Sequence, residues 1–193
     1  MLSRLPRPAR IALLATALIL LALPAAASAA TRTYTMRSQA FTLNGFETLL
    51  PKVWVKSPQV DGYITKFYAI LVYKDGRAVP MQKVMLHHIV FINAGHRGGP
   101  KKVTTCPGRR GESFWGTGEE HERLILPQGY GYQIDRRDRW RMQTMLMSHN
   151  IKPQTLYVRY RFTVVTGRKL WPVRPLWIRA NGCTPYPSYS VPG

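Results

Sequence analysis

Short apolar segments separated by turn-forming residues run through the chain from residue 32 to residue 180. They are rich in Val, Ile, Tyr, Phe and Thr, which favour strands, and none keeps a helical period over its length. Turn signals such as Ser57-Pro58, Asp75-Gly76 and Lys152-Pro153 lie between them. The pattern predicts about eight strands, over residues 32–36, 47–56, 63–73, 82–93, 131–135, 139–149, 155–165 and 176–180.

Two of these segments alternate clearly between their two faces. In residues 155–165 one face carries Leu156, Val158, Tyr160, Phe162 and Val164, and the other carries Tyr157, Arg159, Arg161 and Thr163. In residues 139–149 one face carries Trp140, Met142, Thr144, Leu146 and Ser148. Such alternation is typical of half-buried strands in an antiparallel sheet. The sequence therefore predicts an all-β fold, an antiparallel β-sandwich or jelly roll.

The first thirty residues have a different character. Arg4, Arg7 and Arg10 precede an apolar run over residues 11–23, and small residues follow at 25–30. A positive segment, a short apolar core and an Ala-x-Ala sequence indicate a secretory signal peptide, here residues 1–29. The apolar run is too short for a bilayer, which takes about 20 residues. We expect a secreted, extracytoplasmic domain over residues 30–185, with no transmembrane segment in the mature chain.

Basic residues outnumber acidic ones 28 to 9, for a formal net charge of +19. Without the three arginines of the predicted leader the net charge is about +16, which favours anionic surroundings. The basic residues are scattered, so a solvated basic surface is also consistent with this charge. One functional alternative is a metal-free basic β-sandwich that binds an anionic envelope polymer through exposed Trp115, Trp140 and Trp171. Export makes nucleic acid an unexpected partner.

Cys106 and Cys183 are the two cysteines of the chain. An oxidising compartment favours their pairing in a disulfide, whose long loop would contribute on the order of 4 kcal/mol. The alternative is a metal or redox role, but the two are too far apart in sequence for a CxxC site.

His87 and His88 lie next to each other inside the apolar strand predicted over residues 82–93. An unpaired buried imidazole costs about 1–3 kcal/mol, and one copper, zinc, iron or nickel ion satisfies two imidazoles at once. Adjacent residues of a regular strand point to opposite faces, so both rings reach one ion only where the strand bulges or twists. Without such a bulge, one ring faces the core and the other faces solvent.

His149 supplies a third imidazole from another strand. It ends the segment 139–149, on the same face as Met145 and Met147. We expect the two methionines to pack, although a thioether such as that of Met147 near the ion would favour Cu(I). Three histidines from two strands predict a metal site that bridges the strands.

The remaining candidates lie in loops. Glu119 or Glu120 could orient a ligand histidine through a hydrogen bond. His96, in a glycine-rich turn, and His121, after two glutamates, are expected to be ordinary exposed loop residues. Three histidines with a water also make a catalytic zinc site, so a three-histidine zinc hydrolase is a second alternative, although the sequence identifies no general base.

Several of these motifs recur together in the order of a known family. They are the His-His strand at residues 86–91, Cys106, the segment Leu-Pro-Gln-Gly-Tyr-Gly-Tyr at 126–132, and the strand ending at His149. Over roughly residues 46–165 the chain resembles the N-terminal domain of the copper type II, ascorbate-dependent monooxygenases, which include peptidylglycine α-hydroxylating monooxygenase. The resemblance implies a jelly roll. It also implies that His87, His88 and His149 hold the electron-accepting copper, with ascorbate or another reductant as the electron source.

The chain departs from this family at the second copper. The family's oxygen-activating copper uses a His-x-His pair and a methionine from a second domain, and the sequence has no His-x-His. Residues 186–193 resemble an interdomain linker. The expectation is therefore an exported domain with one copper ion per chain, similar to the electron-accepting half of a C–H-hydroxylating monooxygenase. Its second copper domain would lie outside this chain, and catalysis by this chain alone stays open.

Overall fold

The part of the chain that the structure describes contains twelve strands and no helix. The computed structural model describes residues 29–99, 102 and 111–176. The strands are β1 (Ala30–Arg37), β2 (Phe41–Leu43), β3 (Thr48–Leu49), β4 (Lys52–Val55), β5 (Gly62–Val72), β6 (Val84–Asn93), β7 (Glu112–Gly118), β8 (Leu124–Ile125), β9 (Tyr130–Ile134), β10 (Trp140–Ser148), β11 (Gln154–Thr166) and β12 (Trp171–Pro172). The predicted all-β class is confirmed.

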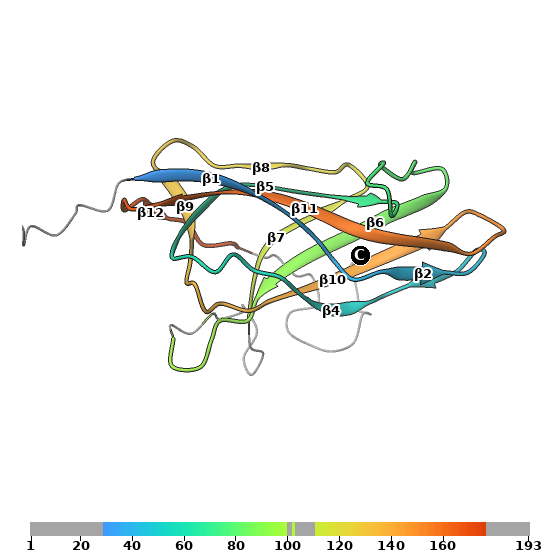
Figure 1. The fold of residues 1–193 in the computed structure, drawn as a ribbon, viewed down its shortest axis with the longest axis horizontal. Coiled ribbons are helices and arrows are strands. Elements are labelled where there is room, and N and C mark those ends of the chain that lie inside the picture. Colours follow the sequence, from blue (N-terminus) through green and yellow to red (C-terminus); the bar gives the residue numbers. More distant parts are fainter. Residues whose placement is uncertain (1–28, 100–101, 103–110, 177–193) are drawn as a thin grey trace, which may run out of the picture.

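The strands pair into two sheets that pack against each other (Figure 1). The seven-stranded sheet has the order β1-β11-β5-β9-β12, with β2 also paired to β11 and β8 to β5. The five-stranded sheet has the order β3-β10-β6-β7, with β4 also paired to β10. Every pairing between these strands is antiparallel except that of β12 with β9. This confirms the antiparallel sandwich, while its jelly-roll connectivity stays a prediction.

The core lies between the two sheets and is rich in aromatic rings. Phe67 of β5 has its ring centroid 4.8 Å from those of Phe91 on β6 and Trp115 on β7, so it joins the two sheets. The inward side chains of β10 and β11 follow the predicted alternation, with Trp140, Met142, Thr144, Leu146, Ser148, Leu156, Val158, Tyr160, Phe162 and Val164 all buried. The faces of both strands are confirmed.

Two tryptophans expected at the surface are part of this core. Trp115 and Trp140 are buried, whereas Trp171 is 72% exposed. The prediction that all three form an exposed binding surface is therefore wrong for Trp115 and Trp140. Trp140 occupies an inward position of an alternating strand, which the apolar pattern of residues 139–149 already indicated.

Some strand boundaries also differ from the prediction. The segment 47–56 is divided at Pro51 into β3 and β4, because proline has no N–H to donate to a ladder. Strand β7 was not predicted, since its sequence ESFWGTG contains two glycines and no alternation; its pairing with β6 holds it extended. Leu176 lies outside the strands, and residues 177–180 lie outside the described residues.

Candidate metal centre

A β-bulge in β6 places His87 and His88 on one face of the sheet. Met145 of β10 pairs with His88, but the next residue, Leu146, pairs with Leu86, so His87 is one extra residue in β6. Leu86 and Ile89 both point into the core. The two residues between them therefore both turn outward. This is the irregularity that a shared ion requires.

The two imidazoles come close at one pair of atoms. Nδ1 of His87 lies 3.2 Å from Nδ1 of His88, and the ring planes are inclined by 76°. The His87 ring is exposed and the His88 ring is half-buried. Metal–imidazole bonds of about 2.0–2.1 Å, as found for zinc, let one ion bridge nitrogens up to about 4 Å apart. The separation of the two Nδ1 atoms therefore fits a single ion.

Neighbouring groups fix the bulge from both sides. The Thr144 hydroxyl of β10 donates a hydrogen bond to the His88 carbonyl at 2.8 Å. On the other side His88 pairs with Gly118 of β7. A Cβ at Gly118 would lie 3.2 Å from the His87 carbonyl oxygen and 2.7 Å from the Glu120 carboxylate, so a larger residue there would crowd the bulge.

The environment favours the uncharged form of His88. Its pKa is lowered from the usual value, first because burial disfavours the charged ring and second because His87 lies next to it. A neutral imidazole offers the lone pair that a metal ion needs, whereas a protonated ring repels a cation. The lowered pKa of His88 therefore suits a metal ligand.

Three methionines share the outer face with the pair. Met145 pairs with His88, and Met147 pairs with Met85 of β6, two positions before His87. All three are half-buried and lie at outward positions of their strands. Thioether sulfur is a soft ligand, and it favours Cu(I) as the bound ion. The predicted place of Met147 near the pair is consistent with this register, and direct ligation stays a prediction.

His149 lies outside the strands of the five-stranded sheet. It follows the end of β10, is exposed, and donates its backbone N–H to the Lys83 carbonyl at 2.9 Å. It stands four residues beyond Met145, which is about 14 Å along a strand. Among the described residues no group of three or more His, Cys, Asp or Glu is placed to hold a metal ion. The structure thus brings His87 and His88 together, and the third ligand stays a prediction.

The two glutamates of the β7–β8 loop differ in position. Glu119 Oε1 lies 3.9 Å from Nε2 of His87, so it is the carboxylate placed to orient that ring. Glu120 instead accepts hydrogen bonds from the Gly118 N–H at 2.8 Å and the Thr117 hydroxyl at 3.2 Å. These bonds, the Gly118 N–H first, lower the pKa of Glu120. Glu120 therefore caps its own turn.

His121 completes this turn in a left-handed conformation, with φ of 52°. Its side chain is partly buried, and within the described part of the chain its buried Nδ1 has no hydrogen-bond partner. The prediction of an ordinary exposed histidine is therefore wrong for His121. A positive φ at a non-glycine residue depends on its turn, which the sequence pattern did not reveal.

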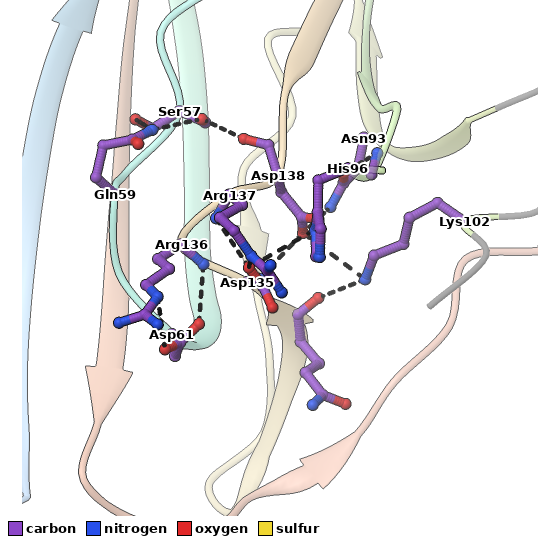
Figure 2. Close-up of polar contacts among 12 residues, drawn as sticks. Ser57, Gln59, Asp61, Asn93, His96, Lys102, Asp135, Arg136, Arg137 and Asp138 are labelled. Carbon is purple, nitrogen blue, oxygen red and sulfur yellow. Dashed lines mark hydrogen bonds and ion pairs between the residues drawn. The ribbon is translucent and has the colours of Figure 1, made fainter. Parts of the chain in front are cut away.

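The prediction of an exposed loop residue is also wrong for His96. Its side chain is only 6% exposed, and its Nδ1 lies 3.3 Å from Asp138 and 3.6 Å from Asp135 (Figure 2). A Cβ on Gly99 would overlap the His96 ring, so the turn covers it closely. His96 is therefore part of a closed polar cluster beyond the end of β6, whereas the histidine pair lies near the middle of that strand.

Asp138 is the centre of that cluster. Its buried carboxylate accepts hydrogen bonds from the Asn93 side chain at 2.7 Å and the Asp135 N–H at 3.0 Å, and Lys102 Nζ lies 3.9 Å away (Figure 2). These contacts join the end of β6 to the turn between β9 and β10. Sequence reasoning missed the cluster because Asp138 and Asn93 are far apart in the chain.

Several predictions fall on residues outside the described ones, among them the linker-like tail predicted over residues 186–193. The signal peptide concerns residues 1–29, of which 1–28 are not described, and neither Cys106 nor Cys183 is among the described residues. Both the leader and the disulfide stay predictions. The described residues contain no helix that is long and apolar enough to cross a membrane.

Comparisons with known proteins give no significant match to a family model, a curated protein or a solved structure.

Proposed function

We propose that the protein is an exported copper-binding domain, similar to the electron-accepting half of a copper type II, ascorbate-dependent monooxygenase. The observation that carries the proposal is the bulge in β6, which turns two adjacent imidazoles to one face with their Nδ1 atoms 3.2 Å apart. Regular strands separate adjacent side chains, so this arrangement needs an added residue at this point.

Three features of the surroundings support copper. The lowered pKa of His88 keeps its ring available as a ligand. Met85, Met145 and Met147 share the outer face, and soft sulfur favours Cu(I) over zinc. Glu119 Oε1 lies 3.9 Å from the far nitrogen of His87, and a carboxylate that accepts a hydrogen bond from that nitrogen would orient the ring.

The resemblance assigns the third ligand to His149, which follows the end of β10. Copper held there would accept and release one electron, with ascorbate or another reductant as its source. The chain's own part is to hold two imidazoles in a fixed geometry. A second copper domain, supplied outside this sequence, would carry the hydroxylation of a C–H bond.

Anaerobic titration with Cu(I) tests the proposal. The wild type should bind one equivalent, and the double variant His87→Ala, His88→Ala should bind none. Gln143→Ala is the matched control, because Gln143 lies on the same outer face, opposite Val90, and should leave binding unchanged. Equal binding by the double variant and the wild type would refute the site.

Two further comparisons refine the proposal. Loss of stoichiometric binding in His149→Ala would identify His149 as the third ligand, and retained binding would remove it from the ligand set. Competition between Cu(I) and Zn(II) under anaerobic conditions separates copper from the zinc alternative. A preference for zinc would overturn the assignment to copper.

A further inference from the structure

A basic face covers the outer side of the seven-stranded sheet. Outward side chains of β1, β11, β5 and β8 surround a groove of about 640 Å³ there. Its lining includes four cations and three threonine hydroxyls, namely Lys66, Arg123, Arg159, Arg161, Thr33, Thr35 and Thr163. We call these seven residues the basic face.

The described lining of the basic face lacks a compensating negative charge. None of the described residues that line the groove is acidic. Lys66, Arg123 and Arg161 form no ion pair with any carboxylate in the described part of the chain. Three arginines elsewhere in the chain each pair with an aspartate. Cations gathered without counter-charge raise the local positive potential and attract anions.

Several of the guanidinium groups are held in place. The Arg123 guanidinium lies over the Tyr68 ring at 4.7 Å, and Arg37, at the edge of the face, lies over Tyr157 at 4.3 Å. Arg159 Nη1 donates to the Gly76 carbonyl at 3.0 Å. Side chains that are already ordered lose less entropy when a ligand binds, and a guanidinium matches the geometry of a planar oxyanion such as carboxylate.

We infer that the basic face binds an acidic polysaccharide chain. The cations would pair with its carboxylate or sulfate groups. The threonine hydroxyls, of which those of Thr33 and Thr163 lie 3.0 Å apart, would hydrogen-bond to its sugar hydroxyls. Single-stranded nucleic acid is bound through bases stacked on open aromatic rings, but the Tyr68 and Tyr157 rings are each covered by a guanidinium.

This inference is independent of the copper proposal. The histidine pair lies on the outer face of the five-stranded sheet, whereas the basic face lies on the outer face of the other sheet. The sandwich core separates the two surfaces, so either proposal can fail without the other.

Binding of dextran sulfate, with uncharged dextran of equal length as the reference, tests the inference. The face variant is Lys66→Ala, Arg123→Ala, Arg161→Ala. The charge-matched control is Lys52→Ala, Lys152→Ala, Lys169→Ala, whose exposed lysines lie on β4 and in the loops that follow β10 and β11. Urea unfolding and far-UV circular dichroism verify that both variants are folded.

The wild type and the control should bind dextran sulfate and not dextran. The face variant should bind it about tenfold more weakly, as expected from the loss of three exposed charge contacts. Equal weakening in the two variants would overturn the inference, since net charge alone would then explain binding. Tighter binding of single-stranded oligothymidine, or of vesicles rich in phosphatidylserine, would also overturn it in favour of that partner.

Discussion

Asp138 shows how much of the structure depends on one buried carboxylate. It is 2% exposed and faces His96, Asn93, Lys102 and the backbone of Asp135. Its partners come from the loops that close one end of the sandwich. Removing such a carboxylate leaves several buried donors without an acceptor, which costs more than the net gain of an ordinary hydrogen bond.

We therefore expect Asp138→Ala to lower the free energy of unfolding by about 3 kcal/mol. Urea denaturation followed by tryptophan fluorescence measures this change. Asp61→Ala is the control, because Asp61 pairs with Arg136 at the surface, and its loss should cost less than about 1 kcal/mol. Equal effects in the two variants would show that the Asp138 cluster does not stabilise the fold.

Glu120 makes the stability of the β7–β8 turn depend on pH. Its pKa is lowered, chiefly by the hydrogen bond from the Gly118 N–H. A lowered carboxyl pKa contributes stability above the unfolded pKa, about 4.3 for Glu, and this contribution disappears as the pH falls through the lower folded value. The stabilisation is therefore present at neutral pH and lost in acid.

The variant Glu120→Gln should accordingly lose less stability than the wild type between pH 6 and pH 3. Urea midpoints measured at several pH values in this range test the expectation. The turn also borders the histidine pair, because Gly118 pairs with His88. Identical pH profiles for the two proteins would contradict the role assigned to Glu120.

At the level of the element, β6 differs from a regular strand by one extra residue, His87. Without His87, the residues from Val84 to Phe91 would alternate regularly, with Leu86 and Ile89 inward and His88 outward. The core already contains the inward residues of that regular pattern. The extra residue therefore serves the histidine pair and adds nothing to the packing of the sandwich.

Deletion of His87 should keep the fold and abolish Cu(I) binding. The loss of the bulge restores a continuous ladder, so the free energy of unfolding should change by less than about 1–2 kcal/mol. Deletion of Val90 is the matched control, because it moves Phe91 from the core to the outer face and should prevent folding. Full copper binding by the His87 deletion would refute the role of the bulge.

The same strand shows what the sequence could predict about the site. Adjacent histidines in an apolar strand indicated a shared ion only if the strand bulged, and the register provides that bulge. The position of the bulge depends on which residues of β10 face β6. That pairing involves residues far apart in the chain, so periodicity within one segment could not locate it.

For the whole molecule, local alternation predicted the sandwich well where strands are long. β10 and β11 bury the predicted faces. Strand β7 was not predicted, because its glycines give no periodic signal. Its strand conformation follows from pairing with β6. The burial of His96 was not predicted for a similar reason, since it depends on Asp138, which lies 42 residues away in the sequence.

The two outer faces of the sandwich have different chemistry. One carries imidazoles and thioethers, which suit a soft metal ion. The other carries cations and hydroxyls, which suit an anionic sugar chain. Under the two proposals, a protein anchored through its basic face would still present the histidine pair to a reductant or to a second domain. The two proposed binding surfaces lie on different sheets, so they do not compete for the same residues.

The most direct test of the central claim is long-range ¹H–¹⁵N NMR of the histidine side chains, recorded before and after one equivalent of Cu(I) under anaerobic conditions. If the pair holds the ion, the Nδ1 resonances of His87 and His88 should change together, while those of buried His96 should stay constant. A change confined to other histidines, or to the Nε2 atoms of the pair, would contradict the assignment of the bulge in β6 as the copper site.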